Sequence, residues 1–233
     1  MKKLMLLICA FLISITVWAN EKSLYEFGWL DNDKEIYVLQ NRRYRKVGKT
    51  YIGALGVKTT SGAFIDAYGA TVRAGYFFRE DWGIEGVFGK SSGSKNDAAK
   101  GVEDVQSQAF YRKVDTYMGA MAMWSPFYSK INTFNKVFYY DWMFGLGLAS
   151  VKLMDNRNQF NSTSNSLTSS NALGMMWNTG LRVYINDNWS LRIDFTGIHA
   201  KPKNEKIEDS GNTVTTSSIF SNYDLGVGLN YTF

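Results

Sequence analysis

Very few residues of this 233-residue sequence could carry out covalent chemistry. Its single histidine, His199, would need a nearby acid and a hydroxyl group or water to form a catalytic site. Asp209 and Ser210 follow it in the sequence, but their spacing supports no such site, and polar loops are rich in these residue types. We therefore predict that the chain has no catalytic residues and is not an enzyme.

Residues that bind metals are equally sparse. The single cysteine, Cys9, lies in an N-terminal segment that we expect to be cleaved, so the mature chain keeps one histidine and no thiol. That set argues against a transition-metal site. Three acidic residues, Asp97, Glu103 and Asp104, lack the spacing of a calcium-binding loop, and we expect them to be solvated. The sequence predicts no metal and no cofactor.

Charged residues form the other chemically relevant set, because several occupy the polar positions of segments with alternating polarity. From Trp189 to Gly197, large apolar residues alternate with serine, arginine, aspartate and threonine. An arginine facing lipid near the bilayer centre would cost about 2–4 kcal/mol. Inside a barrel it can form an ion pair instead. We expect these charges to line the interior: Arg73, Glu85, Asp115, Asp141, Arg182, Arg192, Asp194 and Asp224.

The elements that would position these charges are β-strands with one polar and one apolar face. The last segment shows this most clearly, because apolar residues occupy every second position from Tyr223 to Phe233. An eight-stranded barrel is just wide enough to be filled by its own side chains, so we expect ion pairs to close it; a ring of charges selecting ions is the alternative. Eight segments predict an all-β, antiparallel transmembrane β-barrel: residues 50–58, 66–78, 82–91, 110–124, 136–152, 172–185, 189–199 and 219–233.

The connections between these segments alternate between short and long. Residues 79–81 and 186–188 form tight turns, whereas residues 90–109, 153–171 and 200–218 are long and polar. Short periplasmic turns and long outer loops are typical of barrels in the bacterial outer membrane. A secreted β-sandwich or lipocalin-like barrel is the soluble alternative. Three tryptophans would form an aromatic girdle at the periplasmic interface: Trp82, Trp124 and Trp189.

The ends of the chain fit the same location. Residues 1–19 combine two lysines, an apolar run and a small final residue, the pattern of a cleaved signal peptide. Residues 20–49 would form a periplasmic arm and residues 50–233 the barrel. A closed barrel pairs its last strand with its first, so the chain can end on Phe233 without leaving a sheet edge. Loss of the two lysines lowers the formal charge from +5 to +3, which does not indicate nucleic-acid binding.

A basic run stands immediately before the first expected strand. It is either a solvated linker or an anchor on anionic lipid headgroups, where each basic residue would contribute about 1 kcal/mol. The sequence supports the two interpretations equally. The residues concerned are Arg42, Arg43, Arg45, Lys46 and Lys49.

The first half of the chain resembles a known family. The stretch EIYVLQNRRYRKVGKTYIGALGV (residues 35–57) is followed by IDAYG (65–69) and YFFREDWGIE (76–85). This order, over about residues 35–89, is similar to a family of small outer-membrane β-barrel proteins from gliding and predatory bacteria. The resemblance implies a barrel without a catalytic motif, and some relatives are associated with motility machinery at the envelope. The terminal Phe233 resembles the signal by which the barrel-insertion machinery recognises its substrates.

Some of the expected strands are apolar on both faces. TYMGAMAMW (116–124), YYDWMFGLGLA (139–149) and ALGMMW (172–177) could bury their second face in the barrel interior or against another subunit or trapped lipid. Residues 35–40 form a further strand-like segment, which could pair with a neighbouring chain. We therefore expect a non-enzymatic structural or interaction protein that contacts outer-membrane lipid and forms a homo-oligomer through the arm and middle strands. A narrow pore is the alternative, and a membrane enzyme is less favoured.

Overall fold

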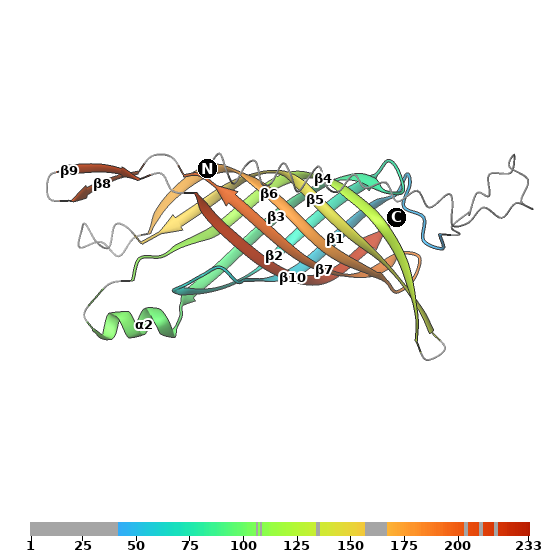
Figure 1. Cartoon of the computed structure of the whole chain (residues 1–233), viewed down its shortest axis with the longest axis horizontal. Helices are drawn as coiled ribbons and strands as arrows, with labels where there is room; N and C mark the ends of the chain where they lie inside the picture. Colours follow the sequence, from blue (N-terminus) through green and yellow to red (C-terminus); the bar gives the residue numbers. More distant parts are fainter. Residues whose placement is uncertain are drawn as a thin grey trace, which may run out of the picture. The chain divides into compact units, whose positions relative to one another are not determined.

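The computed structural model describes residues 42–105, 107, 109–133, 136–156, 167–202, 205–209, 212–216 and 219–233. Eight long antiparallel strands close into a barrel (Figure 1), in the order β1-β10-β7-β6-β5-β4-β3-β2. Tyr51 pairs with Thr232, so the first strand closes the barrel against the last. The strands are β1 (Thr50–Thr59), β2 (Ile65–Phe77), β3 (Trp82–Lys95), β4 (Arg112–Thr133), β5 (Lys136–Asp155), β6 (Thr168–Tyr184), β7 (Trp189–Ala200) and β10 (Phe220–Thr232).

Alternation in the sequence becomes alternation between the inside and the outside of the barrel. Along β1, every second residue from Tyr51 to Val57 is buried, and the residues between them are exposed. The exposed positions of the other strands carry large apolar side chains, such as Ile84, Leu146 and Leu148. An apolar outer face and a closed ring of strands are what a membrane-spanning barrel requires, because lipid surrounds it and no sheet edge may remain open. Among the described helices, none has the length and apolar character needed to cross a bilayer.

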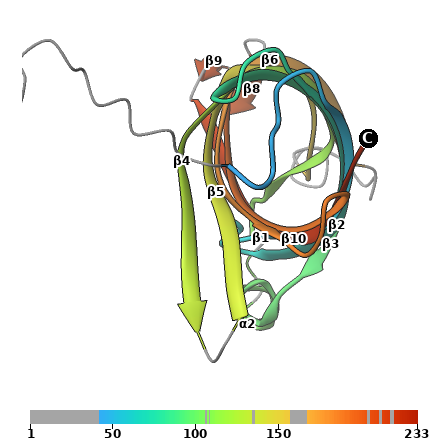
Figure 2. The same ribbon diagram turned by 90° about the vertical axis from the view of Figure 1, so that its right-hand side faces the viewer.

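One hairpin is much longer than the sequence suggested. The segment expected to end at Trp124 continues in β4 to Thr133, and β5 begins at Lys136, so the two strands pair beyond the ring. Figure 2 shows both strands running out of the ring of the barrel. The register shifts between Trp124 and Phe127, where Pro126 stands. A bulge accommodates this proline, which cannot donate a ladder hydrogen bond, so the strand resumes after an apparent stop.

The long connections also contain regular structure. Strand β3 extends to Lys95, and helix α2 (Asp97–Asp104) follows, with the Asn96 side chain accepting a hydrogen bond from the backbone N–H of Ala99 as its N-cap. The last long connection contains a small separate hairpin, β8 (Glu205–Asp209) and β9 (Asn212–Thr216). The expected signal peptide, the arm as far as residue 41 and its strand-like segment 35–40 lie outside the described residues.

The inner faces of the middle strands form an apolar core inside the barrel. Met121, Met123, Met143 and Met176 have exposed fractions of 2% or less and belong to one cluster with Tyr117. Methionine suits such a space because its unbranched side chain fills irregular gaps. The two-sided apolar character of these strands is therefore accounted for within one barrel, and these side chains give no support for a contact between subunits.

Candidate functional site

A charge cluster crosses the middle of the barrel. The Glu85 carboxylate on β3 lies 2.7 Å from Arg73 Nη1, on β2, and 2.5 Å from Arg192 Nη1, on β7. Asp194 completes the cluster, because its carboxylate lies 2.8 Å from Arg192 Nε and 3.2 Å from Arg73 Nε. All four residues are at most 1% exposed. The cluster therefore holds two positive and two negative charges with almost no solvent-exposed surface.

Neutral polar groups add further hydrogen bonds to this cluster. The Tyr51 hydroxyl donates to Glu85 Oε2 at 2.5 Å, and Arg73 Nη2 donates to Thr196 Oγ1 at 2.9 Å. Such additional hydrogen bonds are what allow a buried ion pair to offset its desolvation cost. We call Arg73, Glu85, Arg192 and Asp194 the central cluster. Together with the methionine core it places side chains that are at most 2% exposed across the middle of the barrel.

A second polar layer lies at the end of the barrel that carries the tight turns, here named the short-turn end. Lys46 Nζ donates to Asp141 Oδ2 at 2.8 Å and to Ser125 Oγ at 2.7 Å, and the Tyr184 hydroxyl donates to Asp141 at 2.6 Å. Burial lowers the pKa of the Lys46 ammonium, and the charge of Asp141 opposes that shift. The prediction that Lys46 binds lipid headgroups is wrong, because its side chain is 3% exposed and points into the barrel.

The backbone explains how a residue outside the strands reaches the interior. Gly48 has φ of +74°, a left-handed conformation that favours glycine. Its N–H donates to the carbonyl oxygen of Phe77 at 2.7 Å, and the Lys49 N–H donates to that of Lys46 at 3.0 Å. This tight turn folds the segment before β1 across the barrel end. No signal in the sequence distinguished Lys46 from its basic neighbours.

The remaining residues of the basic run lie nearer the surface. Arg42 Nη1 is 3.6 Å from Glu80 Oε2, and the Arg42 guanidinium lies over the Tyr128 ring of β4. Arg43 is exposed and lies over the rings of two tyrosines, while Arg45 is exposed and Lys49 half-buried. These positions do not test whether the four residues bind lipid headgroups, so that role stays a prediction.

Arg182, Asp224 and Asp115, the other expected interior charges, differ in position. Arg182 and Asp224 are each 1% exposed, and Asp224 accepts a hydrogen bond from Thr59 Oγ1 at 2.6 Å. Asp115 is not in the interior, and that prediction is wrong. It lies where the register of β4 and β5 shifts between Val114 and Thr116, and its carboxylate is 3.8 Å from the partly exposed Lys152 Nζ. A bulge changes which face a side chain points to, so alternation fails there.

The three expected girdle tryptophans all point outward. Trp82, Trp124 and Trp189 are about 40% exposed, at 39%, 42% and 44%. Trp82 stacks with Trp124 at 6.1 Å, and the row continues through Phe144 to Trp142. Aromatic rows of this kind are characteristic of the membrane interface. Phe233 is 65% exposed, and its N–H donates to the Thr50 carbonyl oxygen at 3.0 Å.

His199 has its two ring nitrogens occupied on the outer face of β7. Nε2 accepts a hydrogen bond from Trp177 Nε1 at 3.0 Å, and Nδ1 lies 2.9 Å from Ser221 Oγ. The indole nitrogen can only donate, so neutral His199 carries its proton on Nδ1 and donates it to Ser221. The geometry is therefore the reverse of a histidine that activates a serine. Within the described part of the chain, no three His, Cys, Asp or Glu side chains come together to hold a metal.

Comparisons with known proteins agree with this architecture. A family model described as an outer membrane protein beta-barrel domain matches residues 40–233. The structure resembles OprG of Pseudomonas aeruginosa (12% identity, TM-score 0.52), over 82% of this chain and 98% of that one. It also resembles Neisserial surface protein A (14% identity, TM-score 0.50), over 80% of this chain and 99% of that one. Among proteins with curated descriptions, none matches this sequence.

Proposed function

Because this chain belongs to the family of outer membrane protein beta-barrel domains, we propose that it serves the bacterial outer membrane as a closed, non-enzymatic structural or interaction protein. The observation that carries this proposal is the packed interior. The central cluster and the methionine core fill the barrel between its two ends with side chains that are at most 2% exposed. A transport role would require a continuous water path past Glu85, where both carboxylate oxygens are already engaged by arginine.

The interaction element in this proposal is the part of β4 and β5 that extends beyond the barrel, named here the projecting hairpin (residues 127–133 and 136–138). The neighbouring strands of the barrel do not reach it. Strand β3 pairs with β4 only as far as Trp124, and β6 pairs with β5 only from Tyr139 onward. Both edges of the hairpin are therefore unpaired among the described residues. Unpaired strand edges are templates for pairing with another chain.

The side chains of the projecting hairpin favour protein contact. Phe127, Ile131, Val137 and Phe138 are between 45% and 56% exposed. Exposed apolar residues beside open strand edges are typical of surfaces that bind a partner. The short-turn end faces the periplasm in the proposed orientation, since short turns lie on that side in bacterial barrels. The partner that we propose is a second copy of this chain, whose arm supplies the pairing strand.

Native mass spectrometry of the full-length protein in mild detergent tests this proposal. We expect an oligomer that dissociates in the double variant Ile131→Asn and Val137→Asn. Ile219→Asn is the matched control, because Ile219 is also exposed, at 68%, but lies beside β10 at the opposite end. A strictly monomeric wild-type protein would overturn the homo-oligomer. An oligomer that persists when residues 20–40 are deleted would overturn the role of the arm.

We also propose that the chain groups with the small barrels of gliding and predatory bacteria. The supporting observation is the order of residues 35–89, which lies largely in the arm and in β1 to β3. Sequence profiles built from that group and from other outer-membrane barrels provide the test. A better score of residues 35–89 against the other barrels would overturn the grouping.

A further inference from the structure

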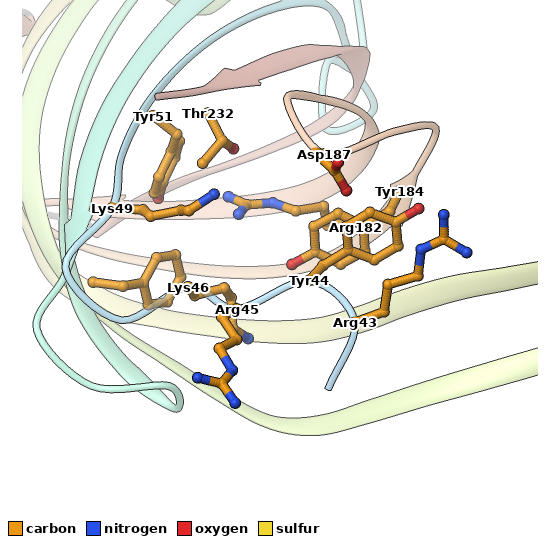
Figure 3. A pocket seen from close by; sticks show the side chains of 11 residues that line it. Arg43, Tyr44, Arg45, Lys46, Lys49, Tyr51, Arg182, Tyr184, Asp187 and Thr232 are labelled. Atoms are coloured by element: carbon orange, nitrogen blue, oxygen red, sulfur yellow. The ribbon is translucent and has the colours of Figure 1, made fainter. Parts of the chain in front are cut away.

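A cavity of about 360 Å³ opens at the short-turn end of the barrel (Figure 3). The segment before β1 forms one wall, and the ends of β1, β2, β6 and β10, with the turn that carries Asp187, contribute the others. Its volume lies at the lower end of the range for sites that bind small molecules. The stacked rings of Tyr44 and Tyr184, with centroids 4.6 Å apart and planes at 7°, give it a rigid aromatic side.

The lining of this cavity is strongly cationic. The lining contains one carboxylate, Asp187, against four basic residues that have no acidic partner in it: Arg43, Arg45, Lys49 and Arg182. A fifth, Lys46, is balanced by its ion pair with Asp141, so it does not add to the excess. A concave surface with like charges and low-dielectric walls concentrates oppositely charged ligands. The cavity therefore favours an anion.

Arg182 points to a specific kind of anion. Its side chain is 1% exposed, and its guanidinium lies over the Tyr51 ring at 4.4 Å from the centroid. Nε and Nη2 have no hydrogen-bond partner among the described residues, although both are buried. Arg192, by contrast, contacts two carboxylates in the central cluster. Buried donors without acceptors cost free energy, which a bound oxyanion would recover.

We propose that this cavity binds a phosphate group, with Arg182 as its central ligand. The Nε and Nη2 edge of a guanidinium is planar and presents two parallel donors that match two oxygens of an oxyanion. The excess of basic over acidic lining residues favours a doubly charged phosphate over a single carboxylate. Lys49 extends toward Arg182, whereas Arg43 and Arg45 are exposed, point outward and add positive charge at the rim of the cavity (Figure 3). The phosphate could belong to a soluble phosphate ester or to a lipid headgroup, since the chemistry of recognition is the same.

Calorimetric titration of the full-length protein in non-ionic detergent tests the site, with inorganic phosphate and short-chain phosphatidylglycerol as separate probes. We expect Arg182→Gln to weaken phosphate binding by about tenfold or more, as loss of charge-assisted hydrogen bonds should. Arg182→Lys keeps the positive charge but loses the pair of parallel donors, so its affinity for phosphate should lie between those of the wild type and Arg182→Gln. Arg79→Gln is the matched control, because Arg79 belongs to a turn at the same end but is 69% exposed and lies outside the cavity.

The outcomes separate the possibilities. Binding of inorganic phosphate identifies a soluble phosphate as the source, whereas binding of the lipid alone identifies a headgroup. No heat of binding from either probe, equal binding by Arg182→Gln, or tighter binding of citrate than of phosphate would overturn the proposal. Heat-dependent migration on gels reports folding of each variant. Arg182→Gln should still fold, because it removes a buried charge two of whose donors, Nε and Nη2, have no hydrogen-bond partner.

Discussion

Replacing Glu85 with glutamine tests whether the central cluster stabilises the barrel. The substitution keeps the shape of the side chain and removes its charge. In the structure, Glu85 receives hydrogen bonds from Arg73 Nη1, from Arg192 Nη1 and Nη2, and from the Tyr51 hydroxyl. Without its charge, two buried arginines share only the carboxylate of Asp194. Removing one partner of a buried ion pair typically costs about 3–5 kcal/mol, and we expect a loss of that size.

Urea unfolding in lipid vesicles measures this loss, because the midpoint shifts in proportion to the free energy of unfolding at constant slope. Glu103→Gln is the matched control. Glu103 pairs with Lys95 at the surface, where a salt bridge contributes at most about 1 kcal/mol. The double variant Glu85→Gln and Arg192→Gln should lose less than the sum of the single losses, since the two residues are in direct contact. A loss below about 1 kcal/mol for Glu85→Gln would refute the stabilising role of the cluster, because surface pairs already reach that size.

Three further predictions address assembly, orientation and packing. Removal of Phe233, or Phe233→Ser, should lower the amount of folded barrel in the outer membrane far more than the 65% exposure of this side chain suggests. Heat-dependent gel migration of membrane fractions measures that amount, and wild-type levels would contradict the prediction. Protease added to whole cells should cleave within residues 90–109, 153–171 or 200–218 and spare residues 79–81, and the reverse pattern would invert the orientation. Gly147→Ala should destabilise the barrel by about 1–3 kcal/mol in urea unfolding, because a Cβ there would overlap the carbonyl oxygen of Ala120. Gly86→Ala should be neutral, because a Cβ there would have no neighbour closer than 3.8 Å. Equal effects of the two substitutions would contradict the close packing at Gly147.

Much of the barrel could be predicted because a strand places every second side chain on the same face. Ser190, Arg192, Asp194 and Thr196 alternate with apolar residues in the sequence, and all four are buried in the structure. Local alternation therefore identifies the inner face without knowledge of neighbouring strands. The sequence therefore predicts which residues of this strand lie in the interior.

The pairing within the interior could not be predicted in the same way. Arg192 and Glu85 are separated by 107 residues, and their contact depends on where β7 and β3 stand in the closed ring. Lys46 was missed because the turn at Gly48, not a strand, carries it inward. Asp115 was misplaced because a bulge interrupts the alternation. Long-range register and local irregularities therefore set the limits of the sequence-based predictions.

Single-channel recording in planar lipid bilayers tests the closed barrel most directly. Insertion of the protein would be verified independently by protease protection, so that a silent bilayer reports a closed barrel. Because the central cluster and the methionine core fill the cross-section, we predict no current steps above the baseline over the range of applied voltages. Stable, ohmic current steps from folded wild-type protein would contradict the account and identify a narrow pore.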